Sequence, residues 1–260
     1  MTPDSPILSD VLDEARRLLD AATTQNVVIR LFGGTAVQLR VPGQIAPCFV
    51  RVCRDIDLVT LNRKNREVAR FLTSVGYEAN ERFNAINGAE RMVFYDMAHQ
   101  RQLDVFVGSF EMCHRIPVAD RLHVGEDTLP LAELLLTKLQ IFQLNRKDLI
   151  DIWCLLYYHD VTASDDGDTI NGAVVAKILA GDWGLWRTVQ QSIQIVRERL
   201  GELDIDDEGR SRIEDRLTKL WSMVEAEPKS LKWRSRSKVG ERVKWYLEPE
   251  EIAHGSLEGS

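Results

Sequence analysis

The stretch Leu31-Phe32-Gly33-Gly34-Thr35-Ala36 decides how the first half of this chain folds. The apolar, β-branched run at residues 27–32 predicts a strand, and the two glycines end that strand in a turn. Helical spacing resumes over residues 35–40, so we expect a strand that passes directly into a helix. Glycines let the backbone approach an anion, and the N–H groups that begin a helix favour phosphate. Because glycines also end strands for steric reasons, both interpretations stay open.

A second stretch, residues 54–59 (Arg-Asp-Ile-Asp-Leu-Val), predicts two carboxylates on one face of a strand. Side chains two residues apart on a strand point the same way, about 6–7 Å from each other, so Asp55 and Asp57 face one side. Two such carboxylates repel each other, and a divalent cation that prefers oxygen ligands, such as Mg²⁺, relieves the repulsion. The alternative is a solvated edge strand, which the flanking Ile, Leu and Val side chains disfavour.

A third carboxylate, Asp104, stands alone within the apolar strand expected at residues 102–107. A single strand aspartate is more often a hydrogen-bonded structural residue than a catalyst. In combination with Asp55 and Asp57 it suggests three carboxylates on neighbouring strands, which could hold two cations and activate an attacking hydroxyl. The cations would also neutralise charge that develops on a transferred nucleotidyl group.

The remaining patterns predict an α+β protein. In the first half we expect a helix at residues 10–22 with Ser9 as its N-cap, a helix at 65–75, and paired strands at 90–97 and 102–107. After Pro130 the sequence is dense in Leu and Ile at helical spacing. The expected helical stretches there are residues 131–158, 173–179, 185–200 and 213–224.

These elements divide into three expected regions. Residues 1–129 form an α/β domain with a mixed sheet, residues 130–228 form a helical bundle, and residues 229–260 form a basic tail with tryptophans. From 229 to 245 the tail has seven Lys or Arg residues and one acid, interleaved with Trp233 and Trp245. Basic and stacking side chains together suit single-stranded nucleic acid or a tRNA end. A solvated face, or a segment that docks on the acidic body, fits the tail equally well.

Composition and charge narrow the class of protein. The 260 residues are 44% hydrophobic and 28% charged, which disfavours wholesale disorder, and the net charge of −7 argues against coating of nucleic acid by bulk charge. No apolar run is long enough to cross a bilayer, and residues 1–10 carry two acids and no base, unlike a secretory leader. Four cysteines without a CxxC pair do not form a disulfide framework. We expect a cytoplasmic, reduced protein without a membrane partner.

In its motif order the chain resembles the nucleotidyltransferase superfamily of the DNA polymerase β type. The matching order is Gly33-Gly34-Thr35, then Asp55-x-Asp57, then the later strand residue Asp104. The helical segment at residues 135–140 (Leu-Leu-Thr-Lys-Leu-Gln), followed by Arg-Lys-Asp-Leu-Ile-Asp at 146–151, is similar to the AbiEii-like toxins of abortive-infection and type IV toxin–antitoxin systems. The resemblance covers about residues 27–157.

The resemblance implies a role for each matching residue. The triphosphate would be held by Gly33, Gly34 and Thr35. The metals would be bound by Asp55 and Asp57, and Asp104 would complete the triad as ligand and base. Lys138 would reach the nucleotide phosphates, and Asp148 would be the helical acid of the toxin branch. One departure is the long spacing between the glycines and the Asp-x-Asp motif, which makes alignment near Arg51 and Arg54 uncertain. As alternatives, Lys138 could snorkel from an apolar helix. Asp148 and Asp151 could pair with Arg146 and Lys147, or fix the helical half against the sheet.

The activity implied is the Mg²⁺-dependent transfer of a nucleoside monophosphate from an NTP to an acceptor hydroxyl, with two Mg²⁺ ions and release of pyrophosphate. The toxin branch implies an RNA acceptor, with tRNA as one case, and an antitoxin partner. One alternative acceptor is a small hydroxylated molecule such as an aminoglycoside-type antibiotic, since an acidic cleft suits a cationic substrate. A non-catalytic NTP-binding module is the alternative from another class.

Overall fold

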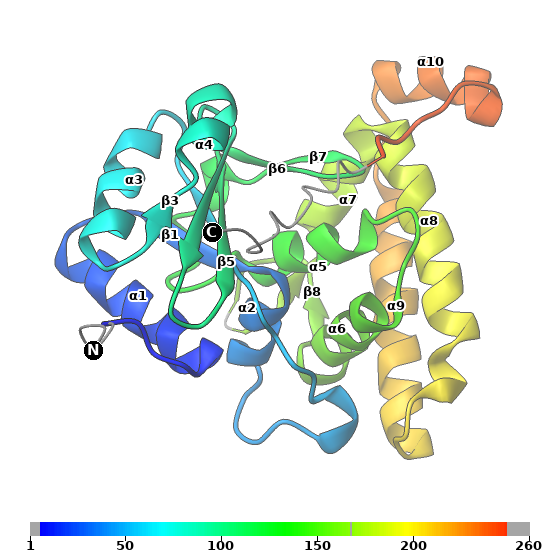
Figure 1. Cartoon of the computed structure of the whole chain (residues 1–260). Coiled ribbons are helices and arrows are strands. Elements are labelled where there is room, and N and C mark those ends of the chain that lie inside the picture. Colours follow the sequence, from blue (N-terminus) through cyan, green and yellow to red (C-terminus); the bar gives the residue numbers. More distant parts are fainter. Residues whose placement is uncertain (1–5, 167, 249–260) are drawn as a thin grey trace.

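A five-stranded mixed sheet forms the first half of the protein, as seen in the computed structural model, which describes residues 6–166 and 168–248 (Figure 1). The strands lie in the order β1-β2-β5-β4-β3, and β2 and β5 are parallel, whereas the other neighbours in the sheet are antiparallel. Their bounds are Ile29–Phe32 (β1), Ile56–Thr60 (β2), Glu78–Ala79 (β3), Arg91–Asp96 (β4) and Arg101–Val107 (β5). The antiparallel pairing of β4 with β5 confirms the predicted strand pair.

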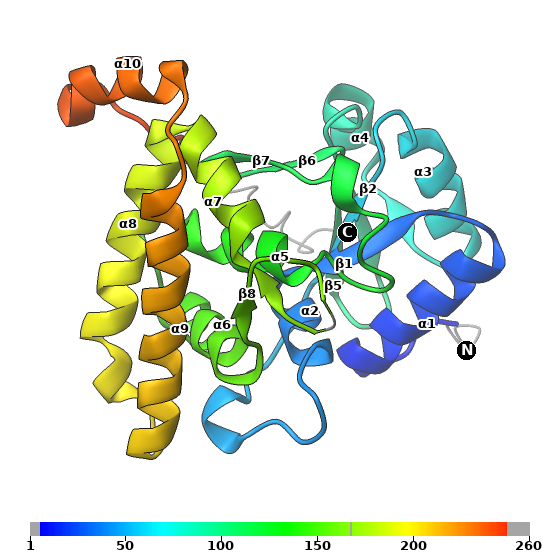
Figure 2. The same ribbon diagram turned by 180° about the vertical axis from the view of Figure 1, so that it is seen from behind.

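Four helices accompany the sheet within the described part of the first half. They are Val11–Thr24 (α1), Gly33–Leu39 (α2), Asn65–Ser74 (α3) and Glu81–Asn87 (α4). Helix α1 begins one residue later than predicted, and its N-cap is Asp10, whose carboxylate accepts the N–H groups of Leu12 and Asp13 at 2.9 and 3.0 Å. The prediction of Ser9 as the cap is therefore wrong, since the carboxylate next to it meets the first turn. Helices α1 and α3 lie on the side of the sheet away from the helical half (Figures 1 and 2).

Short elements that the sequence pattern did not predict complete this half. They are β3, α4, and a hairpin of Ser109–Glu111 (β6) with Arg115–Pro117 (β7). Strands of two or three residues are too short for alternation of apolar and polar side chains to be visible. The hairpin extends from the sheet towards the helical half (Figure 1).

The second half is helical, as predicted. Its helices are Leu131–Leu139 (α5), Arg146–Tyr158 (α6), Gly172–Gly181 (α7), Trp183–Glu198 (α8), Asp207–Ala226 (α9) and Leu231–Val239 (α10), with a short parallel pair of strands at Val161–Thr162 (β8) and Ile170–Asn171 (β9). The two halves share one hydrophobic core. None of the helices that the structure describes combines the length and the apolar character of a membrane span. The α+β class, with a mixed sheet followed by a helical region, is thus confirmed.

The helical stretch expected at residues 131–158 is divided into two helices. The break falls before Asn145, whose side chain accepts the N–H groups of Lys147 and Asp148 at 2.8 and 3.2 Å. The Asp148 carboxylate in turn accepts the N–H of Asn145 at 3.2 Å. This capping box begins α6 in a new direction, although no Gly or Pro marks the break.

The tryptophans of the C-terminal region anchor it to the body of the protein. The Trp233 ring packs edge-on against Trp186, with centroids 5.3 Å apart. The Trp245 indole donates to the Thr188 hydroxyl at 3.1 Å and contacts the ring of Trp183. The basic side chains of α10 remain largely exposed. The expected tail therefore docks on the body through its aromatic residues, and its part from 249 to 260 lies outside the described residues.

Candidate active site

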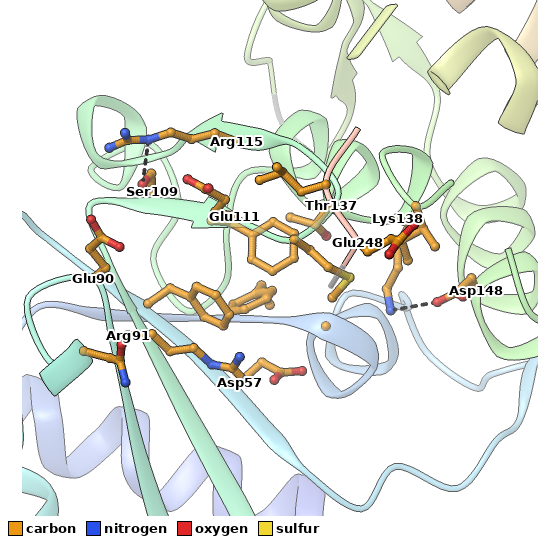
Figure 3. Close-up of a pocket in the computed structure, with 18 of the residues that line it drawn as sticks. Asp57, Glu90, Arg91, Ser109, Glu111, Arg115, Thr137, Lys138, Asp148 and Glu248 are labelled. Carbon is orange, nitrogen blue, oxygen red and sulfur yellow. Dashed lines mark hydrogen bonds and ion pairs between the residues drawn. The ribbon is translucent and has the colours of Figure 1, made fainter. Parts of the chain in front are cut away.

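A cleft of about 640 Å³ lies between the sheet, the β6–β7 hairpin and the start of the helical half (Figure 3). Side chains from distant parts of the chain meet in it. Those that carry charge are Asp57, Glu90, Arg91, Glu111, Arg115, Lys138, Asp148 and Glu248. Three of the sequence-predicted site residues with charged side chains, Asp57, Lys138 and Asp148, therefore line one cavity.

Strand register places the carboxylates of the sheet next to each other. Asp57 on β2 is the direct partner of Asp104 on the parallel strand β5, and Phe32 on β1 is the partner of Asp57 on its other side. Because side chains alternate along a strand, the neighbours Ile56 and Leu58 point to the opposite face, where both are fully buried. The alternation predicted from residues 54–59 is what directs Asp57 into the cleft.

Asp57 is an electrostatically strained group of the cleft. Burial, followed by repulsion from Asp104, raises its pKa to about 7, although the positive charges of Lys138 and Arg91 oppose the rise. In the part of the chain that the structure describes, no side chain or backbone group donates a hydrogen bond to this carboxylate. A pair of adjacent carboxylates with one member open to a cavity fits a hard divalent cation, which would remove the repulsion.

The two glycines make room for charged side chains at the start of α2. Gly33 has a φ of +72°, and a Cβ added to it would overlap the Asp57 carboxylate. A Cβ on Gly34 would overlap the Arg51 guanidinium. Thr35 is buried, and its hydroxyl donates to the Asp55 carbonyl at 3.0 Å, so it ties α2 to the segment that enters β2. The steric interpretation of the glycines is therefore supported directly, and the Thr35 hydroxyl is engaged within the protein.

The other two predicted metal ligands differ from Asp57. Asp104 is buried; Arg91 contacts its Oδ1 through Nε at 2.8 Å and Nη2 at 2.7 Å, and the Gln102 amide donates to its Oδ2 at 2.7 Å. Asp55 precedes β2 by one residue and is exposed. Over the described residues, no group of three or more His, Cys, Asp or Glu side chains is gathered as a metal site. Of the three predicted ligands only Asp57 lines the cleft, and the triad does not form a closed cluster.

A buried network of two cations and two acids faces Asp57 from the helical half. Lys138 Nζ lies 2.8 Å from Asp151 and 3.8 Å from Asp148, and Arg51 contacts both Asp151 oxygens at 2.6 and 2.7 Å. Burial would lower the pKa of Lys138, but Asp151 and Asp148 outweigh it, so the pKa is raised and the ammonium stays charged. Only 12% of the Lys138 side chain is exposed, so it does not snorkel to solvent from an apolar face. Figure 3 shows its ammonium directed towards Asp148 at the edge of the cleft.

Arg51, Asp151 and Arg91 are the members of this site that the sequence motifs did not assign. The suggestion that Asp148 and Asp151 pair with Arg146 and Lys147 is wrong for Arg146, which lies 3.2 Å from Glu202 instead. The alternative, that these acids fix the helical half against the first half, holds for Asp151 through Arg51. One available signal was the three-residue spacing of Asp148 and Asp151, which places both on one helix face.

The opposite end of the cleft is aromatic. The rings of Phe32, Phe106 and Phe110 contact each other edge to face, with centroids 5.0 to 5.4 Å apart. The Arg91 guanidinium lies 5.0 Å from the centre of the Phe106 ring, and Phe83 also lines the cavity. The cleft therefore offers a charged end suited to phosphates and metal and an apolar end suited to a ring system.

Comparison with known proteins gives only distant matches. No protein-family model matches the sequence, and no curated protein matches it significantly. Among solved structures, the lincomycin-bound lincosamide antibiotic adenylyltransferase LnuA aligns at 19% identity and a TM-score of 0.39, over 55% of this chain and 94% of its own. An antigenic nucleotidyltransferase-like protein from Paracoccidioides brasiliensis aligns at 14% identity and a TM-score of 0.40, over 84% and 94%.

A third structure is the STING-associated CdnE c-di-GMP synthase from Capnocytophaga granulosa, at 13% identity and a TM-score of 0.26, over 83% of this chain and 81% of that protein. These likenesses are weak. At TM-scores of 0.40 or lower they carry no argument for function, which rests instead on the residues that meet in the cleft.

Proposed function

We propose that this protein is an enzyme that transfers a nucleoside monophosphate from an NTP to an acceptor hydroxyl with the help of Mg²⁺. The observation that carries the proposal is Asp57, a carboxylate with a raised pKa that projects into the cleft beside Asp104. The resemblance of the sequence motifs to nucleotidyltransferases of the DNA polymerase β type supplies the chemistry. Asp57, together with Asp55 and Asp104, would hold the metal, which when bound neutralises phosphate charge and activates the acceptor hydroxyl.

The chain's own residues would position the nucleotide. Lys138 lies across the cleft from Asp57 with its charge maintained by Asp151 and Asp148, so it can contact a phosphate without being deprotonated. Because Gly33 has no Cβ, the backbone at the start of α2 lies close to Asp57, and this leaves space for the triphosphate. The aromatic end, formed around Phe106, would exclude water from the base or the acceptor.

Incorporation of label from an α-labelled NTP, with pyrophosphate release as a second readout, tests the proposal. The wild type should transfer label in the presence of Mg²⁺ and lose transfer in EDTA, and Asp57→Asn should reduce the rate at least about a hundredfold. Glu90→Gln is the matched control, because Glu90 is an exposed acid on the same cleft that belongs to no part of the proposed metal site. Calorimetric NTP binding without pyrophosphate release on any acceptor would refute catalysis and favour a non-catalytic NTP-binding module.

For the acceptor, we propose an RNA, with tRNA as one case. A groove of about 360 Å³ adjoins the cleft, and Arg115, Lys232, Arg236 and Lys244 contribute its positive charges. Arg115 lines both the groove and the cleft, so an RNA bound along the groove would lead its end towards Asp57. The role as a cytoplasmic toxin with an antitoxin rests on the motif resemblance alone. If expression in cells leaves growth unchanged, or if Asp57→Ala is as harmful as the wild type, the toxin role fails.

A small cationic acceptor, such as an aminoglycoside-type antibiotic, is the second candidate. Glu90, Glu111 and Glu248 line the same cleft and provide negative charge for such a molecule. Parallel transfer assays with total RNA and with a panel of aminoglycosides separate the two acceptors. Label that remains with RNA after removal of small molecules supports the first, and label on the antibiotic supports the second.

A further inference from the structure

Arg91 occupies a position on the sheet that is aimed at Asp104. It is the first residue of β4 and the direct partner of Phe106, whereas Val93, two residues later, is the partner of Asp104. Residues two apart share a face, so Arg91 projects on the same side of the sheet as Asp57 and Asp104. The long side chain therefore reaches the Asp104 carboxylate on the neighbouring strand β5. Figure 3 shows Arg91 beside Asp57 in the cleft.

The contacts of Asp104 differ from those of Asp57. Two guanidinium nitrogens of Arg91 meet Oδ1 of Asp104 at 2.8 and 2.7 Å, and Gln102 donates to Oδ2 at 2.7 Å, so both oxygens are engaged. The Arg91 guanidinium is further held over the Phe106 ring. Asp57 receives no hydrogen bond from the part of the chain that the structure describes. Lys138, the other cation near Asp57, is held by Asp151 at 2.8 Å.

We infer that Arg91 takes the place of a metal ion at Asp104, so that the nucleotide-free protein binds one divalent cation, at Asp57. This inference rests on the proposed function and departs from the two-ion expectation. A guanidinium fixed on Asp104 neutralises that carboxylate and repels a second divalent ion from the same place. Asp57 has Lys138 and Arg91 only as nearby charges, makes no ion pair or hydrogen bond of its own within the described residues, and is the carboxylate at which a cation can bind.

A structural role of Arg91 makes a different prediction. If the Arg91–Asp104 pair only fastens β4 to β5, its removal weakens the sheet but leaves the number of bound metal ions unchanged. If Arg91 stands in for an ion, its removal opens Asp104 to a cation. Counting bound ions therefore separates the two roles without any measurement of activity.

Mn²⁺ binding to the full chain without nucleotide, followed through the electron paramagnetic resonance signal of free Mn²⁺, provides the count. We expect one ion for the wild type, none in the cleft for Asp57→Asn, and two for Arg91→Gln. Arg115→Gln is the matched control, because Arg115 lines the same cleft and contacts a hydroxyl, that of Ser109, at 3.1 Å. It should bind one ion. The double variant Arg91→Gln/Asp104→Asn should also return to one ion, since the second ion requires Asp104.

The number of bound Mn²⁺ ions tests the role of Arg91. Two ions on the wild type, or one ion on a folded Arg91→Gln, would overturn the inference and leave the proposed function standing. No Mn²⁺ on the wild type at millimolar concentration would also overturn the inference, whereas the proposed function fails only if label transfer is absent. The wild-type count stands by itself, so a failure of Arg91→Gln to fold does not remove the test.

Discussion

Replacing Asp57 with asparagine should make the metal-free protein more stable while it abolishes transfer. In the folded protein the pKa of Asp57 is raised from 3.8 to about 7, first by burial and then by Asp104. Each pKa unit corresponds to about 1.4 kcal/mol, so ionisation of this carboxyl costs the folded state about 4 kcal/mol. Because Asp57 borders the cleft, solvent reduces that cost to about 2–4 kcal/mol. Asparagine has nearly the same shape and no charge, so it avoids the cost.

The size of this effect depends on pH, and its sign follows from the raised pKa of Asp57. Between pH 4 and pH 7 the folded protein binds a proton at Asp57 that the unfolded chain has already lost, so wild-type stability falls as the pH rises through this window. The advantage of Asp57→Asn should be close to zero near pH 4, about 1–2 kcal/mol at pH 5, and complete at pH 8.

Urea denaturation in EDTA at pH 5 and pH 8 measures the advantage. The matched control is Asp104→Asn, which removes the charge that faces Arg91 and one of the two oxygens that accept from Arg91 and Gln102, and should lose about 1–3 kcal/mol. Saturating Mg²⁺ should stabilise the wild type, by about 2.7 kcal/mol at one hundred times the dissociation constant, and leave Asp57→Asn unchanged. An Asp57→Asn protein that is no more stable than the wild type at pH 8 would refute the electrostatic strain on which the site is built.

Three further predictions concern the Arg51–Asp151 pair, Gly34 beside it, and His114 in the adjoining groove. Arg51→Ala leaves buried Asp151 with half of its ion pairs and should lower the free energy of unfolding by about 3–5 kcal/mol in urea denaturation. The control Arg146→Ala, at the surface, should lower it by less than about 1 kcal/mol. Equal losses would contradict the buried pairing. Gly34→Ala drives a methyl group into the Arg51 guanidinium and should cost about 1–3 kcal/mol, and a neutral result would show that this arginine moves freely. Burial lowers the pKa of His114 to about 4, so the wild type should lose about 2 kcal/mol relative to His114→Gln between pH 7.5 and pH 5, and parallel stability curves would exclude this effect.

The long elements of the fold could be predicted because their patterns are local. The alternation around Asp57 and the helical spacing after Pro130 each arise from one element that faces the core on one side. The six residues between α5 and α6 escaped prediction because the break depends on a capping box of Asn145 and Asp148, and no Gly or Pro marks it in the sequence. Strands as short as β6 have no period to detect.

The tryptophans of the C-terminal region show a second limit of sequence reasoning. Trp233 and Trp245 among basic residues fit a nucleic-acid platform and a docked segment equally well, because an indole ring stacks on either. The structure shows a docked segment, because Trp233 packs against Trp186 and Trp245 packs against Trp183. Each partner lies about fifty to sixty residues away in the sequence. The basic side chains of α10 remain largely exposed, although Arg236 and Lys244 also make contacts within the protein, and that is why the proposed RNA contact is assigned to charge and not to stacking.

The carboxylates of the sheet show how far a motif can define a site. Strand periodicity places Asp57 and Asp104 on one face, and parallel pairing makes them neighbours, so their meeting was predictable. Which of them stays open was not, because it depends on Arg91, a residue from a third strand with no place in the motif. An aspartate whose two oxygens are engaged by Arg91 and Gln102 cannot attract a cation as strongly as one whose oxygens accept no hydrogen bond from the described residues. The motif therefore defines the edge of the sheet at which metal chemistry can occur, and the side chains packed against that edge determine how many ions it admits.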